Sequence, residues 1–208
     1  MQVNNQASNQ RAISTPPVID IELLALDLNS CTRCVGTLDH IEKAIDIIRP
    51  ILEVTEAQVN VRKIVVESEE QAGQHEFTTS PTVRINGKDI AFETLESECD
   101  SCTDLCGCDE GTSCRVWRYR GKEYTEAPVG LVVESILREI LGSGRESIGQ
   151  TPAYRGVPEN LQRFFKSKSD ARAAAESCCS PVEQETCCEP TEKPACCVAS
   201  EPDACGCK

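Results

Sequence analysis

Apolar residues follow two different spacings in the first part of the chain. Residues 18–27 (VIDIELLALD) are apolar at most positions, which predicts a strand buried on both faces. From Val35 to Ile48 apolar residues recur every three or four positions, and this spacing predicts a helix that Pro50 ends. Residues 58–66 (QVNVRKIVV) begin with alternation and end in an apolar run, so we expect a second strand there.

The next part of the chain has the sequence pattern of a β-hairpin. The segments 82–86 (TVRIN) and 88–92 (KDIAF) flank the dipeptide Asn86-Gly87. Two-residue hairpin turns favour this dipeptide because both of its residues adopt positive φ. The polar residues 67–80 that precede the hairpin predict a loop or a short helix.

A polar stretch separates this hairpin from an amphipathic helix. Residues 93–115 hold five cysteines among polar side chains, and we expect them to form a cysteine-rich insertion. Residues 116–125 predict another small hairpin that turns at Arg120-Gly121. Residues 129–141 (VGLVVESILREIL) carry the apolar stripe of a helix, which Gly142 ends.

The C-terminal third loses the pattern of a core. Residues 143–167 predict a linker with one short helix, in which Leu161, Phe164 and Phe165 pack back on the domain. Residues 168–208 contain mainly Ala, Glu, Ser, Pro and Cys and no aromatic residue. Such a segment cannot offset its ordering entropy by burying apolar surface, so we expect a disordered tail unless a ligand ties it together.

The motif Cys31-Thr-Arg-Cys34 lies where the first predicted strand gives way to the helix. A thiol at a helix N-terminus faces unpaired N–H groups and the positive end of the helix dipole, which favours the thiolate. Arg33 adds to this effect. We therefore assign Cys31 as an attacking thiolate and Cys34 as the resolving thiol that closes a disulfide. Half of a zinc site or two buried cysteines would show the same spacing.

The order of the elements around this motif resembles the thioredoxin-like superfamily. Cys31, Cys34 and Ser80-Pro81 carry the resemblance, which implies an α/β fold with a central mixed sheet and flanking helices over residues 18–142. It also implies a cis Pro81 that shapes the substrate groove beside the dithiol. Over about residues 18–141 the chain is similar to an uncharacterised bacterial and archaeal thioredoxin-like domain of unknown function. The Trp-Cys-Gly-Pro-Cys form of thioredoxin itself is absent.

A ferredoxin-like heavy-metal-binding domain is the alternative for the same segment. There too a C-x-x-C lies between a strand and a helix, and it would bind one soft ion between Cys31 and Cys34. Two observations count against this alternative. The methionine usual ahead of the first cysteine is Asn29 here, and Ser80-Pro81 with its hairpin has no role in that fold.

The predicted insertion carries a second group of cysteines. They are Cys99, Cys102, Cys106, Cys108 and Cys114. Four thiolates close a tetrahedral zinc site, most simply the first four of these. The same ligands would hold an iron–sulfur cluster, although the spacing matches neither familiar ferredoxin run. The remaining alternatives are thiols that pair oxidatively, stay unused, or relay electrons to Cys31 and Cys34.

The tail carries a third group, made of close cysteine pairs. Its members are Cys178, Cys179, Cys187, Cys188, Cys196, Cys197, Cys205 and Cys207. Adjacent cysteines bridge each other poorly, whereas As(III), Hg(II) and Cu(I) bind two or three thiolates. In composition the tail is similar to cysteine-pair tails of arsenic- and mercury-handling proteins. The alternative is a low-complexity tail, against which the regular spacing of the pairs argues.

Charge and composition narrow the classes of partner. The 208 residues carry a formal net charge of −13, which argues against binding to nucleic acid or to anionic membranes. Residues 1–17 are polar and predict a disordered lead-in without the apolar run of a secretory leader, and no run is long enough to span a membrane. We therefore expect a cytoplasmic protein that keeps its 15 cysteines mainly as thiols or metal thiolates.

These observations predict a thiol–disulfide redox protein coupled to the binding or detoxification of a soft metal or metalloid, arsenic or mercury first. Its expected partners are the ion and either a thiol reductant or a protein disulfide. The alternative is a non-enzymatic chaperone or buffer, in which Cys31 and Cys34 join the tail as ligands.

Overall fold

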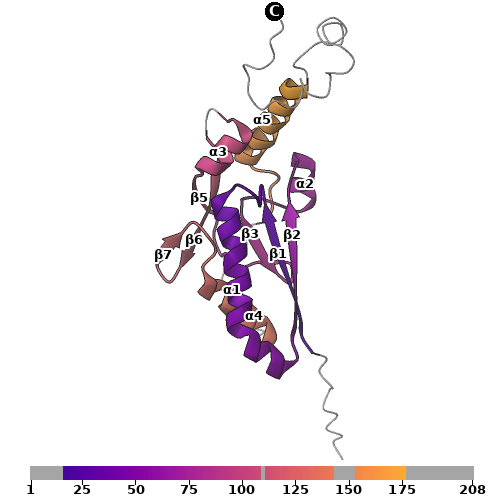
Figure 1. Ribbon diagram of the computed structural model, residues 1–208, viewed down its shortest axis with the longest axis vertical. Helices are drawn as coiled ribbons and strands as arrows, with labels where there is room; N and C mark the ends of the chain where they lie inside the picture. The colour runs from indigo at the N-terminus through magenta and orange to yellow at the C-terminus, as the bar shows by residue number, and fades with distance from the viewer. Residues whose placement is uncertain (1–15, 109–110, 143–152, 177–208) are drawn as a thin grey trace, which may run out of the picture. The chain divides into compact units, whose positions relative to one another are not determined.

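The computed structural model describes residues 16–108, 111–142 and 153–176 (Figure 1). Its elements in chain order are β1 (Val18–Ala25), α1 (Thr32–Thr55), β2 (Gln58–Val65), α2 (Glu69–Gln74), β3 (Thr82–Ile85), β4 (Lys88–Asp89), β5 (Leu95–Glu98), α3 (Asp100–Cys106), β6 (Ser113–Tyr119), β7 (Lys122–Tyr124), α4 (Val129–Ile140) and α5 (Glu159–Glu176). The chain divides into two compact units. The first unit comprises Met1–Val65, Ser80–Leu95 and Arg115–Ala153, and the second comprises Val66–Thr79, Glu96–Cys114 and Tyr154–Lys208.

The first unit contains a four-stranded mixed sheet in the order β2-β1-β3-β4. Strand β1 pairs in parallel with β2 and antiparallel with β3, so that Ile21 lies between Val61 and Ile85. Strand β4 closes the edge by antiparallel pairing with β3. This mixed sheet with flanking helices confirms the expected fold class and is consistent with a thioredoxin-like α/β arrangement. A second sheet has the order β5-β6-β7.

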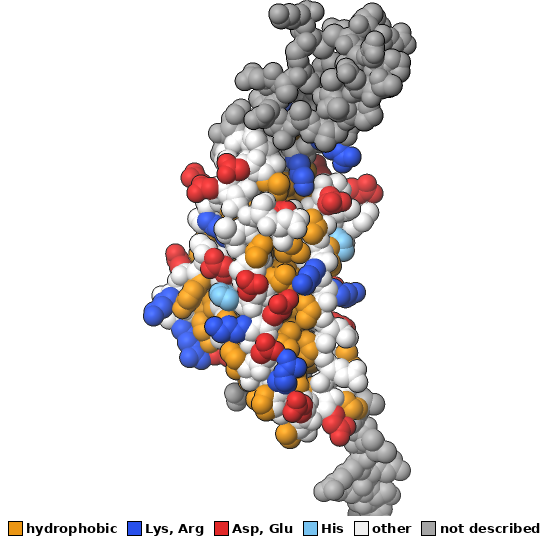
Figure 2. Space-filling view, in the orientation of Figure 1, with side chains coloured by type: hydrophobic (Ala, Val, Ile, Leu, Met, Phe, Trp, Pro, Cys, Tyr) orange, Lys and Arg blue, Asp and Glu red, His pale blue; other side chains and the backbone are white. Residues whose placement is uncertain are grey.

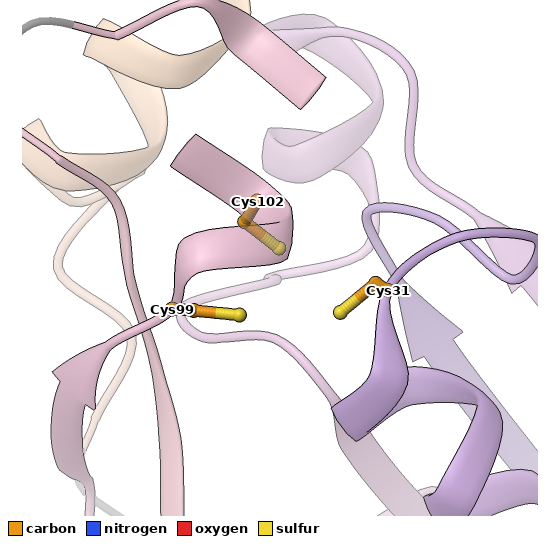
Figure 3. A group of neighbouring side chains, drawn as sticks. All are labelled: Cys31, Cys99 and Cys102. Carbon is orange, nitrogen blue, oxygen red and sulfur yellow. The ribbon is translucent and has the colours of Figure 1, made fainter. Parts of the chain in front are cut away.

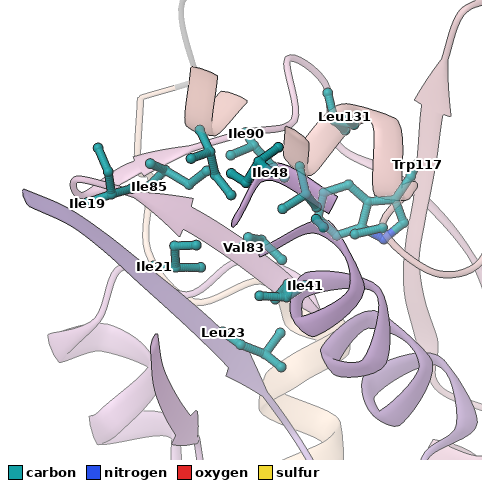
Figure 4. Packing of buried hydrophobic residues seen from close by; sticks show 14 residues of the cluster. Ile19, Ile21, Leu23, Ile41, Ile48, Val83, Ile85, Ile90, Trp117 and Leu131 are labelled. Atoms are coloured by element: carbon teal, nitrogen blue, oxygen red, sulfur yellow. The ribbon is translucent and has the colours of Figure 1, made fainter. Parts of the chain in front are cut away.

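The core of the first unit forms on one face of the sheet (Figure 4). Side chains alternate along a strand, so Ile19, Ile21 and Leu23 of β1 point to the same face. Helices α1 and α4 pack against each other and cover that face, α1 with Ile41 and Ile48. These positions belong to the apolar stripe that predicted the first helix.

Strand β1 is not buried on both faces along its whole length, as the apolar run predicted. Its first half presents Asp20 and Glu22 between the buried isoleucines, and both are only partly buried. Asn60 donates to Asp20 at 3.0 Å and Arg62 forms an ion pair with Glu22 at 2.7 Å. A polar face therefore accompanies the apolar one until Leu23, beyond which successive residues are buried.

Helix α1 continues past Pro50 to Thr55, so the prediction that Pro50 ends the helix was wrong. A proline inside a helix removes one N–H···O=C bond and costs about 3 kcal/mol relative to alanine. Leu52, which is partly buried, packs against the core beyond the proline. Its burial offsets part of that cost and keeps the last turn helical.

Both predicted hairpins are confirmed. Asn86 and Gly87 have φ of 50° and 78° between β3 and β4, and Arg120 and Gly121 have φ of 50° and 75° between β6 and β7. Positive φ at both central residues is the condition that two-residue hairpin turns require. The predicted strand 88–92 is shorter than expected, since β4 ends at Asp89.

The polar stretch over residues 93–115, predicted as a cysteine-rich insertion, contains regular secondary structure. This segment forms strand β5 and helix α3, and it enters β6 at Ser113. Cys99, Cys102 and Cys106 recur at the spacing of one helix face, and all three are buried. Buried cysteines behave as small apolar side chains, so they supply the stripe that the other residues of the segment lack.

Helix α5 also belongs to the second unit and contacts α2 and α3. The prediction that Leu161, Phe164 and Phe165 pack inward is confirmed, because all three are buried. The helix continues to Glu176, whereas the sequence predicted disorder from residue 168. Its last turns contain four alanines, and alanine is the strongest helix former. The rest of the predicted tail, residues 177–208, and the lead-in up to residue 15 lie outside the described residues.

The described surface mixes charges of both signs. On the face shown in Figure 2, acidic and basic side chains alternate among polar and hydrophobic ones. Several charged side chains of the described residues pair, as Lys63 does with Glu42 and Arg118 with Glu93 and Glu123. None of the helices in the described segments is both long and apolar enough to cross a membrane.

Candidate thiol site

Cys31 and Cys34 lie at the start of helix α1, as the sequence predicted. Cys31 is the N-cap residue, with extended backbone at φ −73° and ψ 107°, and its carbonyl accepts hydrogen bonds from the N–H groups of Cys34 and Val35. Cys34 therefore stands in the first turn, directly beside Cys31. Both side chains have an exposed fraction of 0%.

Asp27 shapes the loop between β1 and this helix. Its Oδ2 atom accepts hydrogen bonds from the N–H groups of Asn29 at 3.0 Å, Ser30 at 2.5 Å and Cys31 at 2.9 Å, and from the Ser30 hydroxyl at 2.9 Å. Partial burial raises the pKa of the Asp27 carboxyl, but these donors outweigh it and hold the pKa below its usual value. The ionised carboxylate thus fixes the backbone that presents Cys31.

Ser80 connects the dithiol to two strands. Its Oγ accepts a hydrogen bond from the N–H of Leu26 at 3.1 Å and lies 3.4 Å from Cys34 Sγ. Its carbonyl accepts a hydrogen bond from the N–H of Arg115 on β6 at 2.6 Å. The Ser80–Pro81 peptide bond is cis, as the resemblance implied. The backbone next to Pro81, where an extended substrate was expected to bind, already bonds to β6.

The two thiols of the pair are not equivalent. The pKa of Cys34 is strongly raised, first because its thiol bonds to Cys31, then because it is buried and because the Cys31 thiolate repels a second negative charge. Ser80 and a backbone N–H of Asp27 oppose this shift only in part. Cys34 is therefore a thiol that holds its proton more tightly than an ordinary cysteine.

The cysteines of the second unit gather around helix α3. Cys99 is the N-cap residue of α3, and Cys102 lies one turn later with its Sγ 3.3 Å from Cys114 Sγ. Cys106 and Cys108 are joined in a disulfide. The four-ligand set first expected, Cys99 with Cys102, Cys106 and Cys108, is therefore not the arrangement of this structure, because two of its sulfurs bond to each other.

The second unit brings buried thiols close together, among them Cys99 and Cys102 (Figure 3). Their Sγ atoms lie within 4.8 Å of each other, so they could contribute ligands to a metal ion. In a tetrahedral zinc–thiolate site with Zn–S bonds of about 2.3 Å, the sulfurs lie about 3.8 Å apart. Thiolates also bind softer ions, so these ligands fit a class of ion rather than one element.

The predicted ligands of the tail lie outside the described residues. They are Cys178, Cys179, Cys187, Cys188, Cys196, Cys197, Cys205 and Cys207.

Arg115 is a buried charge that no sequence pattern indicated. Its guanidinium bonds to both carboxylate oxygens of Asp89, at 2.9 Å and 2.7 Å, and stacks 5.0 Å from the centre of the Trp117 ring. An arginine in a short strand shows no pattern that distinguishes it from an exposed one. Arg115 holds β6 to the hairpin strand β4 while its N–H bonds to Ser80.

Comparisons with known proteins give a family but no function. A family model described as "Domain of unknown function (DUF2703)" matches residues 18–136. No curated protein and no solved structure matches the chain. What the thiols do must therefore be inferred from their own geometry and chemistry.

Proposed function

Because the chain belongs to the family of the domain of unknown function DUF2703, we propose its function from its thiols: it is a thiol–disulfide redox protein that binds a soft metal or metalloid ion, with arsenic or mercury the first candidates. The observation that carries this proposal is the unequal pair at the start of α1. Cys34 keeps its proton beside Cys31, which leaves Cys31 as the nucleophile.

The proposed reaction is a dithiol–disulfide exchange with a disulfide substrate. The Cys31 thiolate attacks one sulfur of the substrate, forms a mixed disulfide and releases the other sulfur as a thiolate. Cys34 then gives up its proton and attacks Cys31 Sγ. This step closes the Cys31–Cys34 disulfide and releases the second substrate sulfur as a thiol. A thiol reductant returns the pair to the dithiol form.

The ion-binding part of the proposal rests on the thiols of the second unit. The Sγ atoms of Cys99 and Cys102 lie within 4.8 Å of each other, and Cys114 Sγ lies 3.3 Å from Cys102 Sγ. As(III) binds three thiolates, so these cysteines supply the number of ligands that the ion requires.

A trapping experiment tests the redox part. We expect reduced Cys34→Ser protein mixed with oxidised glutathione to keep glutathione on Cys31, because no resolving thiol is present. The wild-type chain should release it and form the internal disulfide. Trypsin cuts after Arg33 and so separates Cys31 from Cys34, which lets mass spectrometry assign each adduct. Cys31→Ser is the matched control, in which Cys34 should form no adduct.

A second candidate function is ion binding without redox chemistry. One observation favours it: both thiols of the pair are buried, where a disulfide substrate reaches them poorly. A binding protein of this kind would lose affinity for arsenite on Cys31→Ser substitution but would trap no glutathione on Cys34→Ser substitution. The trapping experiment therefore separates the two candidates.

The cellular compartment is part of the proposal. In the oxidising compartments outside the cytoplasm, exposed and paired thiols convert to disulfides. A protein whose proposed chemistry depends on reduced thiols is suited to a reducing environment. We therefore place the protein in the cytoplasm. Localisation of a tagged full-length chain by cell fractionation tests this placement.

A further inference from the structure

Two buried thiols of the second unit lie in direct contact. The Cys114 thiol donates a hydrogen bond to Cys102 Sγ over 3.3 Å, and both side chains have an exposed fraction of 0%. Cys102 is also the member of this pair that lies one helical turn before Cys106 on α3, so it is the thiol placed to attack a disulfide there. An S–S bond is about 2 Å long, so the two sulfurs need to approach by little more than 1 Å to form one.

The same helix carries a disulfide within reach of Cys102. Cys106, bonded to Cys108, follows Cys102 by four residues on α3, so both project from the same face of the helix. Residues four apart in a helix have Cα atoms about 6 Å apart, which is within the range that a disulfide spans. An exchange between these cysteines therefore needs no change in the course of the backbone.

We propose that the second unit is itself a dithiol–disulfide exchange site, in which Cys102 and Cys114 are oxidised by the Cys106–Cys108 disulfide. The Cys102 thiolate attacks Cys106 Sγ; the Cys102–Cys106 bond forms, and Cys108 leaves as a thiolate that takes up a proton. Cys114 then loses its proton and attacks Cys102 Sγ. The Cys102–Cys114 bond forms, and Cys106 leaves and is protonated. Two electrons pass from the buried pair to Cys106 and Cys108, with no outside reactant.

The surroundings of Cys106 support the second step. The Thr112 hydroxyl lies 3.3 Å from Cys106 Sγ, and it is the donor because a disulfide sulfur carries no hydrogen. This hydrogen bond stabilises the negative charge that Cys106 acquires as it leaves. Thr112 is held in place by Thr103, whose hydroxyl accepts a hydrogen bond from the Thr112 N–H at 2.9 Å.

The four cysteines differ in burial, and this difference indicates where an external oxidant reacts first. Cys108 is only partly buried, whereas Cys102 and Cys114 are inaccessible to solvent. An external disulfide therefore reaches Cys108 more readily than the inner pair. The CysGlyCys segment takes up oxidising equivalents at the surface and passes them to thiols that no bulky oxidant contacts. This activity goes beyond the proposed function, because it uses neither Cys31 nor Cys34.

Peptide mapping of the full-length chain tests the exchange. Cleavage before Asp100, Asp104 and Asp109 places Cys102, the Cys106/Cys108 pair and Cys114 on three separate peptides. The reduced protein is oxidised briefly with limiting oxidised glutathione, quenched in acid and labelled with N-ethylmaleimide. We expect the Cys102 and Cys114 peptides to be recovered linked to each other, alongside peptide 104–108 closed on itself.

Three variants identify the route. In Cys114→Ser the exchange should stop at the mixed disulfide, with Cys102 linked to Cys106 and Cys108 labelled; Cys114→Ala repeats the test with a different replacement. In Cys108→Ser the Cys102–Cys114 link should fall about tenfold, because the surface disulfide that supplies it cannot form. Ser101→Ala, a change on the same helix that removes no thiol, is the control and should behave as wild type.

Labelled Cys102 and Cys114 in every sample that contains closed peptide 104–108 would overturn the proposal. So would an undiminished Cys102–Cys114 link in Cys108→Ser, because direct oxidation would then explain that link. Circular dichroism of each variant confirms that it is folded before it is mapped. Failure of this exchange leaves the Cys31 trapping experiment unaffected, so the two proposals stand or fall separately.

Discussion

At the scale of single residues, Asp27 is the side chain that does most to position the dithiol. One carboxylate oxygen accepts hydrogen bonds from three consecutive residues, Asn29, Ser30 and Cys31, and so sets the course of the loop. No sequence motif assigned this role, although an acidic residue a few positions ahead of a helix is a common start signal. The position of the two cysteines at a helix start was predictable because their spacing is distinctive. The hydrogen bonds from the loop to Asp27 were not predictable from the sequence.

Asp27→Asn removes the charge while keeping one acceptor oxygen. Because the pKa of Asp27 is lowered in the folded chain, its stabilising effect is full above its usual value of 3.8 and is lost as the pH falls through the lowered value. We expect the variant to be less stable than wild type by about 1 kcal/mol at pH 7, with the difference shrinking below pH 3.8. Urea unfolding at pH 7 and at successively lower pH measures this difference. A difference in the free energy of unfolding that persists undiminished at the lowest pH would contradict the role of the charge.

The buried ion pair of Arg115 and Asp89 gives a second prediction at this scale. Their side chains are 2% and 12% exposed, so Asp89→Ala leaves an uncompensated buried guanidinium and should cost about 3–5 kcal/mol. Glu93→Ala is the control, because it releases Arg118 from a pair that is 45% and 44% exposed and should cost less than about 1 kcal/mol. Equal free energies of unfolding for the two variants, measured in urea, would show that Arg115 is not held as described.

At the scale of elements, the helices and hairpins that were predicted correctly depend on local sequence signals. The hairpin at Asn86-Gly87 and the helix over residues 129–141 needed only turn chemistry and apolar spacing, and both are present. The boundaries that failed depend on tertiary packing. Helix α1 passes through Pro50 because Leu52 is packed beyond it, and α3 forms because its cysteines supply the buried face.

Pro50→Ala tests this explanation of helix α1. Alanine restores the N–H that bonds to the carbonyl of Asp46, so we expect the free energy of unfolding to rise by about 2 kcal/mol. Arg49→Ala, a neighbouring exposed position, should change it by less than about 1 kcal/mol. Thermal and urea unfolding followed by circular dichroism report both values. A destabilised Pro50→Ala protein would mean that the proline is needed where it stands.

At the scale of the whole molecule, the sequence predicted groups of cysteines but not which of them touch. Spacing along the chain joined Cys99 and Cys102 to Cys106 and Cys108, whereas the structure joins Cys106 to Cys108 in a disulfide and places Cys114 against Cys102. Residues that are distant in sequence give no local sign that they touch. The function of the eight tail cysteines remains a prediction, since they lie outside the described residues.

The central claim is that the chain carries a redox pair at Cys31 and Cys34 and binds a soft ion through the thiols of the second unit. Anaerobic native mass spectrometry with arsenite tests the ion site most directly, on a full-length chain whose eight tail cysteines are replaced by serine. We predict one arsenic ion on the reduced protein and none on Cys102→Ser, because Cys102 lies beside both Cys99 and Cys114. Cys31→Ser should keep the ion. Arsenic bound equally to the wild-type and Cys102→Ser proteins would contradict the account.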